Sequence, residues 1–257
     1  MLTLQSDPIL LAALAVATFL LAGCLKGVIG MGLPTLAIGV LGMVLPTMEA
    51  AALLVIPAFL TNVWQAFDGH ALVLLSRRLW PMLIAQVVGV WVSWSLWSGA
   101  NTSLLAVVLG AVLITYGITG LAGTKVSVNE QQQTPAMIVS GWLSGLVTGV
   151  TGTLAIPVVM FLQALELTKD QFVQAMGLSF ATSSFTLGVL LLADGQLAGN
   201  TGWLGLLAVI AAALGMPIGQ RLRGKLTDQT YKRLFFWLIV LIGTAMVIRA
   251  CSDLWLA

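Results

Sequence analysis

Long apolar segments follow one another along almost the whole chain, and they restrict its fold more than any other feature. Of the 257 residues, 59% are hydrophobic and 8% are charged, whereas soluble domains carry about 25% charged residues. A soluble fold of this length could not bury so much apolar surface, so lipid must surround most of the chain. The net charge of +2 does not suggest a nucleic-acid partner, and one histidine excludes a His-rich metal site. We expect no cofactor.

The apolar segments number five in each half of the sequence, which predicts an all-α, polytopic membrane protein. They lie at about 8–30, 33–46, 48–67, 79–98 and 103–123, and then at about 136–151, 153–167, 172–193, 203–220 and 234–252. A spanning helix needs about 20 residues, and the second segment of each half is shorter. That segment is either a short or tilted span, or a re-entrant half-helix. The polar stretch 124–135 separates the membrane units 1–123 and 136–257, and we interpret it as a cytoplasmic linker.

The two halves repeat one another. With a shift of 118 residues, GCLKGVIGMGLPTLAIGVL (23–41) aligns without a gap on GWLSGLVTGVTGTLAIPVV (141–159), with eight identities in nineteen positions. The spaced glycines and the shared TLAI are less easily produced by chance than matches of leucine and alanine. Internal duplication is common in secondary transporters.

The basic residues predict that the repeats are inverted. In the first half they lie between segments three and four, and in the second half between segments four and five, while the equivalent loops carry none. Basic loops stay in the cytoplasm, so equivalent loops face opposite sides. Five crossings in each half satisfy this, with both termini outside. The residues concerned are Arg77, Arg78, Arg221, Arg223, Lys225, Lys232 and Arg233.

Glycines cluster just before the second segment of each repeat and allow two interpretations. The pairs Gly23/Gly27 and Gly141/Gly145 either let helices approach closely or belong to the site. The later glycines, in GMGLP at 30–34 and GVTGT at 149–153, instead predict a broken helix. A helix broken within the membrane exposes N–H groups and a positive dipole end, which bind anions. Two inverted copies would direct two such ends at one site.

Lys26 lies inside an apolar segment beside the first break, with no acid nearby in the sequence. A cation within the membrane costs about 2.5–3.5 kcal/mol on insertion scales and indicates function. The alternative is that its side chain extends to the cytoplasmic interface. The second repeat has Ser144 at the equivalent position, so a cationic contact would come from one half alone.

Polar residues of the third segments complete the candidate site. They could donate hydrogen bonds to substrate oxygens, or bond to backbone and neighbouring helices. The full set of predicted substrate-binding residues is Lys26, Gly30, Gly32, Thr35, Thr61, Asn62, Gln65, Gly149, Thr151, Gly152, Thr153, Thr182 and Ser183.

The motifs KGVIGMGLPTLAI and SGLVTGVTGTLAIPVV, the repeat distance and the total length resemble the TauE/SafE sulfite exporter family. The resemblance covers nearly the whole chain. It implies a permease, not an enzyme, that moves small sulfur-containing anions such as sulfite, sulfonates or sulfoacetate outward across the cytoplasmic membrane.

Two other functions remain open from the sequence. One is an anion channel with the same site and no alternating access. The other is an intramembrane enzyme or a non-transporting assembly factor. A serine protease would need a histidine on another membrane helix, and His70 is expected at the interface. The oligomeric state, the coupling ion and the substrate itself do not follow from the residues.

Overall fold

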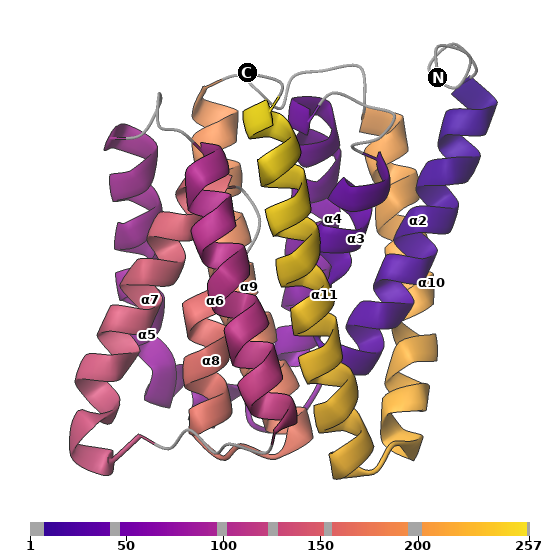
Figure 1. Cartoon of the computed structure of the whole chain (residues 1–257). Coiled ribbons are helices and arrows are strands. Elements are labelled where there is room, and N and C mark those ends of the chain that lie inside the picture. The colour runs from indigo at the N-terminus through magenta and orange to yellow at the C-terminus, as the bar shows by residue number, and fades with distance from the viewer. Residues whose placement is uncertain are drawn as a thin grey trace.

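The computed structural model describes residues 8–41, 47–96, 102–122, 128–151, 156–194 and 202–255. Within these ranges the regular structure is entirely α-helical (Figure 1), which confirms the predicted fold class. The helices of the first half are α2 (Pro8–Ile29), α3 (Leu33–Leu41), α4 (Thr47–Phe67), α5 (Leu72–Leu96) and α6 (Thr102–Leu121). Those of the second half are α7 (Glu130–Thr151), α8 (Ile156–Ala164), α9 (Lys169–Ala193), α10 (Gly202–Lys225) and α11 (Asp228–Trp255).

Several of these helices have the length and apolar character of membrane spans. Among the described residues, five stretches qualify: Ile9–Ile29, Leu72–Ser95, Lys169–Ala193, Leu204–Lys225 and Gln229–Ser252. By contrast, α3 and α8 have nine residues each and rise about 14 Å. The hydrocarbon core is about 30 Å thick, so neither helix crosses it alone. The chain is therefore a multi-pass membrane protein that contains two short helices.

Helices α5 and α7 begin earlier than the hydropathy pattern predicts. Helix α5 starts at Leu72 instead of residue 79, so Arg77 and Arg78 lie in its second turn and not in a loop. Helix α7 starts at Glu130 instead of residue 136. Apolar patterning locates the part of a helix that lies in hydrocarbon, whereas backbone hydrogen bonds continue into the headgroup region. The 25 residues of α5 extend about 38 Å, which exceeds the thickness of that core.

Each of the principal helix pairs joins one helix from each half of the chain. Helix α2 packs on α10, α5 on α7, α6 on α11, and α4 on α9. If α2, α4, α5 and α6 are exchanged for α7, α9, α10 and α11, the same four pairs result. In Figure 1, α2 and α7 run in opposite directions, and the start of α2 lies at the same end of the bundle as the end of α11. The start of α5 and the turn between α10 and α11, which carry the basic residues, lie at the other end.

Glycines allow two of these pairs to form. A Cβ atom on Gly27 would overlap the Met216 carbonyl oxygen of α10, and one on Gly145 would overlap the Gln86 carbonyl oxygen of α5. Gly23 and Gly141 face the backbone of the same partner helices in the same way. These contacts confirm the helix-packing interpretation of the four glycines. Close backbone contact of this kind is the usual basis of helix association in lipid.

Candidate functional site

The first predicted helix break lies between α2 and α3. Helix α2 ends at Ile29 and α3 begins at Leu33. Between them, Gly30 and Gly32 have φ angles of 88° and 101°, which L-residues with a side chain rarely adopt. A Cβ on Gly30 would also lie 2.6 Å from the Met176 side chain of α9. Backbone conformation therefore favours glycine at both positions, and the space beside Gly30 is also too small for a side chain.

The carbonyl groups at this break are bonded by side chains from other helices. Gln65 Nε2 on α4 donates to the Gly30 carbonyl (3.0 Å) and to the Val173 carbonyl of α9 (2.6 Å). The Tyr231 hydroxyl on α11 donates to the Ile29 carbonyl at 2.9 Å. The Gly30 N–H donates to the Lys26 carbonyl at 2.6 Å. That N–H is therefore engaged in the end of α2, where the sequence suggested a free donor.

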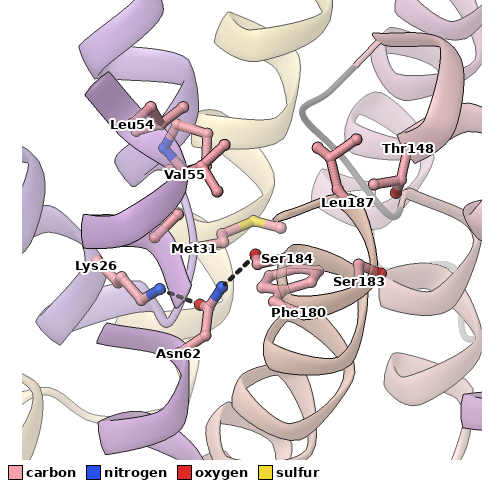
Figure 2. Close-up of a pocket in the computed structure, with 13 residues that line it drawn as sticks. Lys26, Met31, Leu54, Val55, Asn62, Thr148, Phe180, Ser183, Ser184 and Leu187 are labelled. Atoms are coloured by element: carbon pink, nitrogen blue, oxygen red, sulfur yellow. Dashed lines mark hydrogen bonds between the residues drawn. The ribbon is translucent and has the colours of Figure 1, made fainter. Parts of the chain in front are cut away.

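A small cavity lies beside the break, between the third helices of the two halves. Its volume is about 40 Å³, several times the roughly 10–15 Å³ that one water needs by the same measure. This size suits an ion of a few heavy atoms. In the view of Figure 2, most of the polar side chains lie below the apolar Leu54, Val55 and Leu187, while Thr148 lies beside Leu187. The lining residues are Lys26, Met31, Gly32, Pro34, Leu54, Val55, Ala58, Asn62, Thr148, Phe180, Ser183, Ser184 and Leu187.

A short hydrogen-bonded chain crosses the cavity from one half of the protein to the other. The Lys26 ammonium donates to Asn62 Oδ1, and Asn62 Nδ2 donates to Ser184 Oγ at 3.3 Å (Figure 2). An ammonium has three donors and no acceptor, so the oxygen of the Asn62 amide must face Lys26. Its NH₂ group therefore faces Ser184. Lys26 keeps N–H donors that no described side chain uses.

Lys26 is the one charged residue among the described residues that line the cavity, and none of these residues is acidic. Its exposed fraction is 2%, so its ammonium does not reach the interface as the alternative interpretation required. The acids Asp68 and Asp170 contact Arg223 instead, at 3.7 and 3.4 Å. A buried ammonium without a counterion is unfavourable, and a bound anion would relieve that cost.

The structure brings four of the predicted residues together at the cavity: Lys26, Gly32, Asn62 and Ser183. Gly30 and Gln65 lie directly behind them, at the break, and are not part of the lining. Gln65 has 2% of its surface exposed, and its Oε1 atom has no hydrogen-bond partner among the described residues.

Three other predicted residues lie away from the cavity lining. The Thr61 hydroxyl donates to the Pro57 carbonyl at 2.7 Å, and the Thr182 hydroxyl donates to the Leu178 carbonyl at 3.0 Å. Both therefore bond to their own helices. Gly149 packs against Ser93 and Val90 of α5, so it serves helix packing and not a break.

The second break is only partly covered by the structure. Helix α7 ends at Thr151 and α8 begins at Ile156. Gly152 and Thr153 lie outside the described residues, as do the side chains of Thr35 and Thr151. Ser144, the counterpart of Lys26, accepts a hydrogen bond from the Val158 N–H at 2.8 Å. It thereby bonds an amide in the first turn of α8 and does not line the cavity.

Sequence reasoning missed several residues of the site. Ser184 belongs to the polar run Thr182–Ser184 that the sequence offers as possible donors, but the predicted set ended at Ser183. Thr148 was not predicted, because the glycines beside it in the sequence drew the interpretation toward helix packing and a helix break. Its hydroxyl donates to the Ser144 carbonyl at 2.8 Å. Gln86 of α5 lies behind Ser183 and donates to its hydroxyl. An isolated glutamine in an apolar segment needs a partner in lipid, and this was the available signal.

Comparison with known proteins supports the resemblance seen in the sequence. A model of the family described as sulfite exporter TauE/SafE matches residues 15–246. Comparisons with curated proteins and with solved structures gave no match. The family match spans most of both halves of the chain, all the described residues that line the cavity, and the break between α2 and α3. The chain therefore belongs to the sulfite exporter TauE/SafE family, a family of membrane transporters.

Proposed function

We propose that the protein is a secondary transporter that exports a small oxyanion, most simply sulfite or a sulfonate such as sulfoacetate, across the cytoplasmic membrane. The observation that carries this proposal is the buried Lys26 ammonium, which faces a cavity of about 40 Å³ with no acid among its described lining residues. Such a site favours a ligand with negative charge and acceptor oxygens. Family membership supports the sulfur-containing class.

The anion would be held from both halves of the chain. Lys26 supplies charge and Asn62 fixes the position of the ammonium. Ser183 and Ser184 supply hydroxyl groups from α9. The N-terminus of α3, where Gly32 and Pro34 line the cavity, adds the positive end of a helix dipole. An acceptor-only anion would thus find donors on opposite walls.

The proposed mechanism is alternating access by two inverted repeats, which we place at 1–123 and 136–257 around a cytoplasmic linker at 124–135. It is supported by the pairing of helices, which is preserved when the halves are exchanged, and by the opposite directions of α2 and α7 (Figure 1). It is also supported by the position of the cavity between α4 and α9. Small rotations of one half against the other would open it to one side and then the other. An interior-negative potential would favour anion export by about 2.3 kcal/mol per charge per 100 mV.

Efflux from liposomes tests this proposal. Vesicles that contain the purified protein are loaded with sulfite, sulfoacetate or sulfate. They should release sulfite and sulfoacetate faster than loaded vesicles without protein do. This release should become faster when a potassium gradient makes the vesicle interior negative. Protein that releases none of these anions would overturn the proposed function. Release that is insensitive to the potential would overturn the proposed driving force alone.

A further inference from the structure

A second hydrogen-bonded chain reaches the cavity from behind α9. Gln86 on α5 and Ser179 on α9 are both fully buried, and neither lines the cavity. The Ser179 hydroxyl donates to Gln86 Oε1 at 3.0 Å, and Gln86 Nε2 donates to Ser183 Oγ at 2.5 Å. Ser183 does line the cavity. The polar group of Gln86 therefore connects to the site through one cavity residue.

The direction of these bonds determines what Ser183 can offer a ligand. A hydroxyl has one proton and two lone pairs. Because Ser183 Oγ accepts from Gln86, its proton remains to be donated, and no described residue accepts it. Ser184 is in the same state, since its oxygen accepts from Asn62 Nδ2. One series of hydrogen bonds thus runs from Lys26 to Ser184, and a separate series runs from Ser179 to Ser183. Each series ends at a serine hydroxyl whose proton no described residue accepts.

We propose that Gln86 is a positioning residue of the anion site, which holds the Ser183 hydroxyl as a hydrogen-bond donor to the substrate. This inference rests on the proposed function, because it requires a ligand with acceptor oxygens. Without Gln86, the Ser183 proton could turn to the Ser179 carbonyl one helical turn earlier, as serine and threonine side chains in helices commonly do. The site would then lose one donor and present a lone pair to the anion.

The inference also defines the ligand class more narrowly. Lys26 presents donors from one wall, and Ser183 and Ser184 present donors from the opposite wall, so the favoured ligand is an anion whose oxygens are unprotonated toward both walls. Ligands that present O–H or N–H groups to these three side chains would leave the donors unpaired, which is costly in a buried site. Bonds within each chain also polarise one another and strengthen the terminal donor.

The test is a binding measurement on purified full-length protein, with sulfite and nitrate as the probes. Gln86→Met removes the amide with little change in volume, and Ser183→Ala removes the hydroxyl. Each should raise the dissociation constant of sulfite by about 5- to 10-fold. Because Gln86 acts through Ser183, the double variant should bind no more weakly than the weaker of the two single variants.

A matched control is Gln174→Met. Gln174 is a buried glutamine of α9 whose amide bonds to the Ala66 carbonyl at 2.8 Å and to the Ala71 N–H at 3.2 Å, away from the cavity lining. We expect it to lower thermal stability while leaving the dissociation constant within about twofold. This control separates general loss of packing from loss of the oriented hydroxyl.

The outcomes distinguish the inference from the proposed function. An unchanged dissociation constant in Gln86→Met, or a double variant whose loss is the sum of the single losses, would overturn the role of Gln86. If the unaltered protein binds sulfite but does not transport it, the proposed function is overturned. The role of Gln86 would still be tested by the dissociation constants of its variants. If neither sulfite nor nitrate binds the unaltered protein, both proposals fail.

Discussion

The Lys26 ammonium of α2 donates a hydrogen bond to Asn62 Oδ1 of α4, and both side chains are almost fully buried. This contact places a cation where its described surroundings offer an amide oxygen and no carboxylate. Asparagine satisfies one donor of the ammonium without neutralising its charge. In the proposed function, the remaining charge attracts the anion to the cavity between α4 and α9, and most of the predictions below depend on it.

Asn62→Asp should weaken the binding of anions at the site. The introduced carboxylate would lie beside Lys26 with nearly the same shape and would serve as a permanent counterion. Hydrogen bonds to charged groups contribute about 1.5–3 kcal/mol, so we expect sulfite affinity to fall by about 10- to 150-fold. Isothermal titration calorimetry on purified protein measures this change.

The control for Asn62→Asp is Thr182→Val, since the Thr182 hydroxyl bonds to its own helix. Sulfite affinity should stay within about twofold of the unaltered protein, which is within about 0.4 kcal/mol. A large loss of affinity in Thr182→Val would show that Thr182 does contribute to the site. Undiminished affinity in Asn62→Asp would show that Lys26 does not attract the ligand.

Replacing Lys26 and Asn62 together should separate stability from binding. The double variant Lys26→Met with Asn62→Leu substitutes apolar groups of similar size for a buried polar pair, a change that is often neutral or stabilising. We expect the melting temperature without ligand to stay the same or rise. Differential scanning fluorimetry in detergent should detect this.

The same melting temperatures should also be measured with sulfite present. At a concentration 100 times the dissociation constant, a ligand that binds the folded state stabilises it by about 2.7 kcal/mol. The unaltered protein should show the corresponding rise in melting temperature, and the double variant should show none. An equal rise in both would place the anion elsewhere.

Gly145→Ala should destabilise the α5–α7 pair. The added Cβ would overlap the Gln86 carbonyl and lie 2.8 Å from the Cα of Gly89, and overpacking typically costs about 1–3 kcal/mol. Gly224→Ala in α10 is the matched control, because a Cβ there meets nothing within 4 Å. It should be neutral or stabilise the helix by up to about 1 kcal/mol. Thermal unfolding of both variants checks this, and equal behaviour would contradict the packing assigned to Gly145.

Much of the fold could be predicted because apolar segments and glycine patterns depend on lipid and backbone contact. The ten segments correspond to ten described helices, and the break at Gly30 and Gly32 was indicated by a glycine pair before a proline. Helix ends were less predictable, as at Arg77 and Glu130, because a helix can continue beyond the hydrocarbon while its side chains become polar.

Residues of the cavity lining were predictable where the polar side chain could not form its hydrogen bonds within its own helix. A lysine inside a membrane helix cannot bond to its own backbone carbonyls without exposing its charge to lipid, so Lys26 indicated a polar environment, and the structure places it in the lining of the cavity. Threonines can bond to the carbonyl one turn earlier, and the sequence does not distinguish Thr61 or Thr182 from a ligand-binding residue. Gln86 was missed because its role depends on which helix packs against α5.

Sulfite counterflow in proteoliposomes tests the central claim most directly. Vesicles containing the unaltered protein and excess unlabelled sulfite should transiently accumulate labelled sulfite from outside, because a carrier with one alternating site exchanges its substrate across the membrane and a channel does not. Vesicles with equal amounts of folded Lys26→Met protein should show no accumulation above empty vesicles. Accumulation by Lys26→Met at the same rate and half-saturating concentration as the unaltered protein would contradict the account.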